Sequence, residues 1–167
     1  MVAIAEHGYL LGIGSNLAPD DNIGHIVHHL LSQFDTMIVS SVLRIPPVGM
    51  ESEHDFLNLV AYIPTPWPQS ELKAFCNQVE IQLGRDRTDP NSHIKDRPAD
   101  LDILAAITDI YHYHTPTAAI TDEAFLHPLL AELLAYIHHK PRPLNTPGIM
   151  IKGRGLTFGK TATTIYR

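Results

Sequence analysis

The sequence predicts an α+β fold in which helices pack on an antiparallel sheet. Apolar runs of two kinds alternate along the chain: short runs rich in β-branched residues, and longer runs with apolar side chains at helical spacing. They follow one another as strand, helix, strand, strand, helix and strand, which is the ferredoxin-like βαββαβ pattern. A chain of 167 residues has room for one core. We therefore expect a single domain over residues 1–167, with the helices on one face of the sheet.

The first half of the chain supplies a strand, a helix and a second strand. Residues 9–14 form a continuous apolar run typical of a buried strand. Residues 21–34 carry apolar side chains three or four positions apart, and Asp20 or Asp21 is placed to cap the predicted helix. Residues 36–45 alternate loosely and are rich in β-branched side chains, which predicts a strand.

The second half continues the pattern with a strand, a helix and a strand. Residues 56–63 predict the strand that pairs with the preceding one. Residues 70–83 predict a helix, with Ser70 as its N-cap and Gly84 as the glycine that ends it. Residues 99–107 predict the last strand of the pattern.

Three segments fall outside this pattern. Residues 85–98 are a polar loop without apolar periodicity, and residues 122–137 predict an additional helix. Residues 140–167 mix proline and glycine with short apolar pieces, so no element is assigned to them.

Composition and charge exclude several classes of protein. The net charge of −6 argues against a general nucleic-acid binder, which needs a basic face to replace the counterions of phosphates. No apolar run approaches the roughly 20 residues of a membrane span, and the first residues lack the pattern of a signal peptide. Cys76 is a single cysteine in an apolar helical pattern, typical of a buried thiol in a reducing compartment. We expect a cytoplasmic protein without membrane or nucleic-acid partners.

Two acidic residues on the last strand suggest a cation site. Because strand residues two apart point to the same face, Asp100 and Asp102 would project together while Leu101 and Ile103 face the core. Magnesium commonly takes one or two carboxylates plus substrate phosphates. The alternative is a solvated strand face that carries two acids.

Four cations precede this strand. Arg85, Arg87, Lys95 and Arg97 lie in the polar loop and could grip a polyphosphate, because arginine matches phosphate oxygens and stays charged at any working pH. The alternative is a surface loop of mixed charge, in which these cations pair with the three aspartates among them.

Two residues of the second strand suit a flat heterocycle. Phe56 and Asn58 share one face, which gives a ring for stacking and an amide with donors and acceptors. Alternatively, Phe56 belongs to the core and Asn58 bonds at the strand end. Glu80 lies shortly before Arg85, and as an isolated feature it reads as an exposed helix acid.

The order of these motifs resembles the 6-hydroxymethyl-7,8-dihydropterin pyrophosphokinase family over roughly residues 9–133. The motifs that carry the resemblance are Gly14–Leu17, Pro46–Gly49, Asp55–Asn58, Glu80–Arg87 and Arg97–Ile103. The resemblance implies a ferredoxin-like fold that binds the co-substrate ATP and a hydroxymethyl-dihydropterin side by side. It implies a folate-pathway kinase that transfers pyrophosphate to the pterin and releases AMP.

The resemblance also implies roles for the nucleotide-side residues. Asp100 and Asp102 would hold two Mg²⁺ ions, and Arg85, Arg87 and Arg97 would contact the triphosphate, with Lys95 as a further cation. Arg85, Arg97 and the two aspartates would carry the catalysis, because positioning and electrostatics dominate phosphoryl transfer. Glu80 would belong to the nucleotide site.

The pterin side of the implied site comes from three other segments. Phe56 and Phe125 would stack on the two faces of the ring, and Asn58 would bond its edge. Backbone groups around Pro46 and Val48 would complete the recognition. We expect a monomer or weak dimer.

The sequence departs from the family pattern at the loop and the rim. Residues 92–96 replace a Trp-Gly-Pro motif, Pro116–Thr117 replaces Pro-His, and Glu123 stands where a basic residue is common. Two alternatives therefore stay open. One is a weakened or inactive paralogue that binds pterin or nucleotide, and the other is an interaction domain without a small-molecule site.

Overall fold

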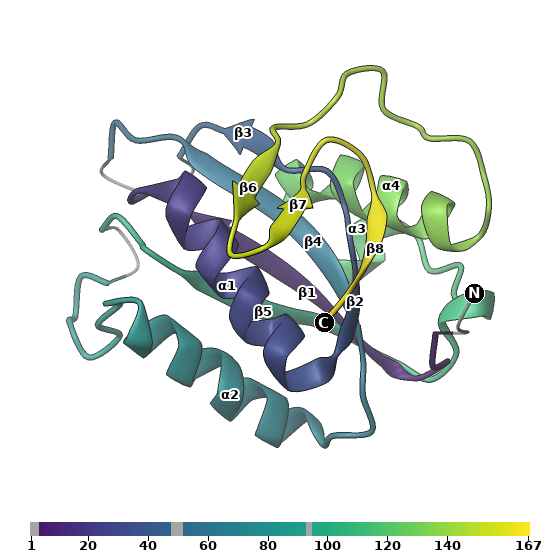
Figure 1. Ribbon diagram of the computed structural model, residues 1–167, viewed down its shortest axis with the longest axis horizontal. Coiled ribbons are helices and arrows are strands. Elements are labelled where there is room, and N and C mark those ends of the chain that lie inside the picture. The colour runs from purple at the N-terminus through teal and green to yellow at the C-terminus, as the bar shows by residue number, and fades with distance from the viewer. Residues whose placement is uncertain (1–3, 48–51, 93–94) are drawn as a thin grey trace.

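The computed structural model describes residues 4–47, 52–92 and 95–167, which fold around an antiparallel sheet (Figure 1). The sheet comprises β1 (Gly8–Ser15), β2 (Thr36–Val39), β3 (Leu43–Ile45), β4 (Phe56–Pro64), β5 (Asp100–Ile107) and β8 (Thr163–Tyr166). Its order is β5-β1-β4-β2-β8, with β3 also paired to β4, and each of these pairings is antiparallel. The first and third strands of the predicted pattern lie side by side at the centre, which confirms the ferredoxin-like fold.

The two helices of the predicted pattern lie on one face of the sheet, as expected, and the additional helix covers the other face, which the pattern did not include. The helices α1 (Pro19–Phe34) and α2 (Gln69–Gln82) lie on one face, and α4 (His127–Ile137) lies on the other (Figure 1). Leu11 and Leu59 belong to the core under α1 and α2, whereas Leu10 and Val60 belong to the core under α4. Because β1 and β4 are apolar on both faces, both faces need a cover.

The short helical segments lie between β5 and α4. They are η1 (Ile110–His112), α3 (Thr117–Ile120) and η2 (Ala124–Leu126). The predicted helix over residues 122–137 thus begins only at His127, after the single turn of η2. Within the described ranges, no helix is both long and apolar enough to span a membrane.

The predicted helix caps differ from the observed ones. Ala18, with φ 39°, is the N-cap of α1, and Asp20 and Asp21 lie in its first turn, where their charges favour the helix dipole instead. Pro68 precedes α2 and Ser70 lies inside the helix. Gly84 follows α2 with φ 97°, a left-handed conformation that confirms its role in ending the helix.

The predicted strand over residues 36–45 is interrupted at residues 40–42. Ser40 still pairs with β4 through its backbone N–H, which donates to the Val60 carbonyl at 2.9 Å. Val42 instead donates to the carbonyl of Gly159 at 2.8 Å. The interruption therefore lets the C-terminal segment bond to the middle of the strand.

The C-terminal segment, left unassigned from the sequence, adds a hairpin and an edge strand. The hairpin of β6 (Ile151–Gly153) and β7 (Leu156–Phe158) packs against α1, and β8 extends the sheet beside β2. A buried carboxylate, Glu132 on α4, holds this segment: it accepts from Arg142 Nε at 2.8 Å and from the Ala162 backbone at 3.2 Å.

Candidate active site

The start of β5 presents two carboxylates to a pocket. Asp100 and Asp102 lie on the same face of the strand, while Leu101 between them is fully buried. The pocket has a volume of about 250 Å³, and its walls come from β1, the ends of β3 and β4, β5 and the segment before α4. The lining residues are Gly12, Ile13, Gly14, Ile45, Pro46, Phe56, Asn58, Arg97, Asp100, Asp102, Glu123, Phe125 and Leu126.

The pocket brings most of the predicted site residues together. Phe56 and Asn58 are both nearly buried, at 8% and 7% exposure, on the wall opposite Asp100 and Asp102 along the sheet. Pro46 and Phe125 line the same pocket from other segments. The prediction for Val48 lies outside the described residues.

Glycine at position 14 is required by the close approach of β1 to the part of the pocket wall formed by Phe56 and Asn58. A Cβ atom there would lie 2.6 Å from Asn58 Oδ1 and 3.5 Å from Phe56 Cδ1. The amide and the ring therefore pack directly against the backbone of β1, where any side chain would displace them.

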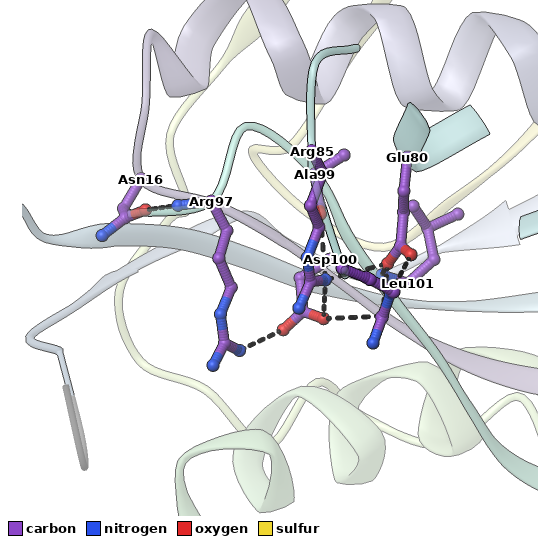
Figure 2. A network of polar contacts seen from close by, with 8 residues as sticks. Asn16, Glu80, Arg85, Arg97, Ala99, Asp100 and Leu101 are labelled. Atoms are coloured by element: carbon purple, nitrogen blue, oxygen red, sulfur yellow. Dashed lines mark hydrogen bonds and ion pairs between the residues drawn. The ribbon is translucent and has the colours of Figure 1, made fainter. Parts of the chain in front are cut away.

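The carboxylate of Glu80 binds two of the arginines, Arg85 and Arg87. Figure 2 shows it beside Arg85 and the backbone of Leu101. The carboxylate has no exposed surface and accepts hydrogen bonds from Arg85 Nη1 at 3.0 Å and from Arg87 Nε at 2.6 Å. The backbone N–H of Leu101 donates to it at 2.8 Å. The interpretation of Glu80 as an exposed helix acid is therefore wrong: the carboxylate is fully buried, and four hydrogen bonds from Arg85, Arg87 and Leu101 compensate its burial. The residue ties α2, the arginine segment and β5 together.

Asp100 lies between two guanidinium groups (Figure 2). Arg85 Nη1 donates to Asp100 Oδ1 at 2.8 Å, and Arg97 Nη1 donates to Oδ2 at 3.0 Å. The surface-loop alternative, in which the arginines pair only with neighbouring loop aspartates, is thus wrong for Arg85 and Arg97. Both arginines instead donate to Asp100 on β5, the strand that carries the two carboxylates predicted to bind a metal ion.

A second pocket continues the site on the far side of Arg97. It has a volume of about 330 Å³, and Arg85, Lys95 and Arg97 contribute cations to its wall. Arg97 lines both pockets. Lys95 differs from the arginines because it is 59% exposed and forms an ion pair with Asp89, so it matches the mixed-charge alternative. Arg87 is turned toward Glu80 and does not line either pocket.

The two aspartates differ in their electrostatic surroundings. Burial, and then the charge of Asp100, raise the pKa of Asp102 above its ordinary value, although Lys73 and Arg87 oppose the shift. Within the described part of the chain, Asp102 accepts no hydrogen bond. Burial, followed by the charges of Asp102 and Asp100, also raises the pKa of Glu123. The pocket therefore carries more negative charge than its own cations compensate.

The carboxylate oxygens of Asp100 and Asp102 are suitable ligands for a magnesium ion that also binds a phosphate. Asp100 and Asp102 offer hard oxygen ligands on one face, and a bound cation would relieve the repulsion that raises the pKa of Asp102. Among the described residues, no group of three or more acidic, histidine or cysteine side chains could hold a metal ion. Phosphate oxygens and water would have to complete the coordination, as is usual for Mg²⁺.

Sequence reasoning gave no site role to three residues here, although Asn16 lies in the Gly14–Leu17 motif and Glu123 was noted as a departure from the family pattern. Asn16, at the end of β1, binds the backbone of Arg97 in both directions: its Oδ1 accepts at 2.6 Å and its backbone N–H donates at 3.0 Å. Glu123 lines the pocket. Lys73, on α2, acts on the charge of Asp102. Lys73 is seven residues before Glu80, a spacing that places both on one helix face and could have revealed it.

Comparison with known proteins agrees with this geometry. The chain matches the family of 7,8-dihydro-6-hydroxymethylpterin-pyrophosphokinases over residues 10–135. A protein of Bacillus subtilis (strain 168), called 2-amino-4-hydroxy-6-hydroxymethyldihydropteridine pyrophosphokinase, is 34% identical over 97 residues, which are 56% of this chain and 56% of that protein. A protein of the same name from Porphyromonas gingivalis (strain ATCC 33277) is 31% identical over 103 residues, 56% of this chain and 65% of that protein. Each match thus spans less than two thirds of the relative's own length.

Proposed function

This chain belongs to the 7,8-dihydro-6-hydroxymethylpterin-pyrophosphokinase family, and from this premise we propose that it transfers pyrophosphate from Mg-ATP to the hydroxymethyl group of 6-hydroxymethyl-7,8-dihydropterin. AMP is the second product, and the reaction belongs to folate biosynthesis. One observation carries the proposal: Asp100, Asp102 and Arg97 line the same pocket as Phe56 and Asn58. A phosphate-binding side and a heterocycle-binding side therefore meet in one cavity.

The pterin binds between the two phenylalanines of this pocket. Phe56 and Phe125 offer apolar ring faces, and the buried amide of Asn58 offers a donor and an acceptor to the edge of the heterocycle. Pro46 closes the same wall. The hydroxymethyl group then points toward the aspartates at the start of β5.

The triphosphate binds along the arginines between the two pockets. Arg85 and Arg97 present guanidinium groups held by buried or partly buried carboxylates, so they are oriented before the substrate arrives. Lys95 is more exposed and contributes at the rim of the second pocket. Arg87 would reach the phosphates only by turning away from Glu80, to which it is bonded here. Glu80 serves the nucleotide site indirectly, by holding Arg85 and Arg87 in place.

The reaction is an in-line displacement at the β-phosphorus. The pterin hydroxyl oxygen forms a new bond to this phosphorus and gives up its proton to water. The bond from the β-phosphorus to the oxygen bridging to the α-phosphate breaks, so that AMP leaves. Asp100 and Asp102 would hold magnesium, which would neutralise charge on the phosphoryl oxygens. Arg85 and Arg97 stabilise the same oxygens, because charge spreads over them in the transition state.

We extend the proposal to two Mg²⁺ ions, a monomer or weak dimer, and a cytoplasmic location. The pair of ions is what the family resemblance implies, and Asp100 and Asp102 would share their ligation with phosphate oxygens. Burial raises the pKa of the Cys76 thiol to about 12, as fits an inert thiol in a reducing compartment. The net charge of −6 supports the absence of nucleic-acid partners.

The test is an AMP-release assay with purified protein, ATP, Mg²⁺ and 6-hydroxymethyl-7,8-dihydropterin. We expect one AMP for each pterin pyrophosphorylated, and no AMP when either the pterin or Mg²⁺ is left out. Binding of ATP and pterin without AMP release would instead identify a paralogue that binds its ligands but has lost catalysis.

A further inference from the structure

Asp96 is the meeting point of two segments that lie far apart in the sequence. Asp96 lines the second pocket but not the pocket that holds Phe56 and Asn58, which we call the pterin pocket. Its carboxylate accepts hydrogen bonds from the hydroxyl of Ser52, from His54 Nδ1 at 2.6 Å and from Asn16 Nδ2 at 2.9 Å. Ser52 and His54 immediately precede β4, whereas Asp96 immediately precedes Arg97. We name Asn16, Ser52, His54 and Asp96 the interloop latch.

Asn16 joins the interloop latch to the site itself. It is only 3% exposed, and its Nδ2 donates to the His54 carbonyl at 3.3 Å as well as to Asp96. Its Oδ1 accepts from the Arg97 backbone at 2.6 Å. One amide at the end of β1 thus holds both segments at once, and a displacement of either segment strains its bonds to the other.

The negative charge of Asp96 strengthens the hydrogen bonds within the interloop latch. Burial alone would raise the pKa of Asp96, but the hydrogen bonds from Ser52 and His54 outweigh it and lower the pKa. The carboxylate is therefore ionised at neutral pH and remains an acceptor for each of these donors.

The position of the latch connects the two halves of the pocket. Two residues after His54, β4 begins with Phe56, which lines the pterin side. One residue after Asp96, Arg97 reaches Asp100 with its guanidinium group at 3.0 Å. Because one residue spans at most about 3.6 Å, Phe56 cannot move far from His54, nor Arg97 far from Asp96.

We propose that Asp96 is a positioning residue, which fastens the segment before β4 to the segment that carries Arg97 and so assembles the pterin and phosphate sides of the pocket together. This inference rests on the proposed function. It goes beyond that function by assigning to Asp96, Ser52 and His54 the alignment of two substrate-binding walls.

A second His–Asp pair provides a matched control. His112 Nδ1 lies 2.7 Å from Asp109 Oδ2, nearly the distance of the His54–Asp96 pair, but the two residues are three positions apart and lie past the far end of β5. Breaking that pair disturbs one local turn, whereas breaking the His54–Asp96 pair releases a contact between residues 42 positions apart.

Limited trypsin digestion tests the latch without any substrate. Trypsin cleaves after Lys95 and is blocked after Arg97 by Pro98, so the bond between Lys95 and Asp96 reports on this segment. We expect His54→Ala, which leaves this bond's own sequence intact, to speed its cleavage about two- to fivefold, as fits a largely exposed ion pair. Cleavage at Arg154–Gly155, on an exposed hairpin turn, is the internal reference and stays constant.

The control and the contrary outcome are equally direct. His112→Ala leaves cleavage after Lys95 at the wild-type rate. Ser52→Ala, which removes a different donor to the same carboxylate, reproduces the effect of His54→Ala. If neither His54→Ala nor Ser52→Ala accelerates this cleavage, the two segments are not fastened through Asp96 and the proposal is overturned, whatever activity the protein has.

Nucleotide binding separates positioning from simple loop order. The probe is the magnesium complex of α,β-methylene ATP, whose α–β linkage cannot be cleaved, titrated by calorimetry. We expect Asp96→Ala to weaken binding about tenfold, because Arg97 loses its alignment. We expect Asp96→Asn to recover part of the affinity, because its amide oxygen can still accept from Ser52 and Asn16 although His54 loses its acceptor. Equal affinity of Asp96→Ala and wild type, or no recovery in Asp96→Asn, would refute the positioning role.

Discussion

Asp100 and Asp102 share one strand face, but their surroundings make them different residues. Asp100 is neutralised by Arg85 and Arg97 at hydrogen-bond distance. Asp102 lacks a hydrogen-bond donor within the described ranges, and burial together with the charge of Asp100 raises its pKa. An acid kept in an unfavourable environment is typical of a functional site, where stability is given up for binding or catalysis.

Replacing Asp102 with asparagine is expected to separate stability from activity. Turnover falls by about 100-fold or more, because a carboxylate ligand contributes several kcal/mol of charge stabilisation through the metal. Without Mg²⁺ at neutral pH, the free energy of unfolding rises: a carboxyl with a raised folded-state pKa destabilises the fold above that pKa, and the stability returns as the pH falls through it. AMP release and urea denaturation measure the two effects, and a loss of stability would contradict the assignment.

At the scale of elements, α2 and β5 are joined by one buried carboxylate. Glu80, at the last turn of α2, bonds the backbone of Leu101 in β5 and the side chains of Arg85 and Arg87. The helix therefore sets both the position of the strand and the direction of the arginines. The site depends on how these elements are joined as much as on the residues that touch substrate.

Glu80→Gln is expected to loosen this junction. A neutral amide leaves Arg85 buried without its full counter-charge, which costs about 3 kcal/mol of unfolding free energy, and the misdirected arginines raise the KM for ATP. Chemical denaturation and steady-state kinetics check both effects. Glu71→Gln, an exposed acid in the first turn of the same helix, is the matched control and leaves both values near wild type.

Gly14 on β1 pairs with Asn58 on β4, and this pairing predicts that a side chain at position 14 displaces the Asn58 amide. Gly14→Ala places a methyl group 2.6 Å from Asn58 Oδ1, so the amide must move from its position in the pocket. We expect pterin affinity to fall about tenfold, in line with an overpacking cost of about 1–3 kcal/mol. Fluorescence titration with the pterin measures the loss.

Gly12→Ala is the control for this change on the same strand. Its methyl group would meet the end of the Leu126 side chain at 3.3 Å, a contact that a shift of a few tenths of an ångström relieves. We expect a smaller loss of affinity, and a larger loss than in Gly14→Ala would exclude the role given to Asn58.

At the scale of the whole molecule, the C-terminal segment lies beyond the residues that match the family but still packs on the sheet and on α1. The match ends at residue 135, yet β8 pairs with β2 and the β6–β7 hairpin packs on α1. The carboxylate of Glu132, which is 1% exposed, accepts hydrogen bonds from Arg142, Ser41 and Ala162. These bonds connect α4, the interrupted strand and the C-terminal segment. A buried carboxylate of this kind acts as a fastener.

Arg142→Gln is therefore expected to lower stability and leave the chemistry intact. Removing the cation leaves Glu132 buried with only neutral donors, which costs about 2–3 kcal/mol after allowance for the partial exposure of Arg142. Neither residue lines the pterin pocket, so kcat and KM stay near wild type. Thermal unfolding and the AMP assay test this, and a selective loss of activity would show that the segment takes part in catalysis.

The sequence was sufficient for the parts of the fold that local periodicity encodes. Apolar alternation and helical spacing identified β1, β4, β5, α1 and α2, because burial of one face imposes a regular repeat on neighbouring residues. Boundaries at Asp20 and Ser70 were less accurate, since a proline at the helix start replaced the expected side-chain cap. The alternation around Leu101 likewise sufficed to place Asp100 and Asp102 together.

What the sequence by itself determined was the central pattern of strands and helices and a set of charged and aromatic residues suited to a phosphorylated substrate and a heterocycle. Only the tertiary structure decided which partners these residues have: Glu80 with its arginines, Asp96 with Ser52 and His54, and the C-terminal strand beside β2. The physical reason is that periodic burial is written in adjacent positions, whereas the partner of a polar group depends on which distant segments the packed core brings within about 3 Å.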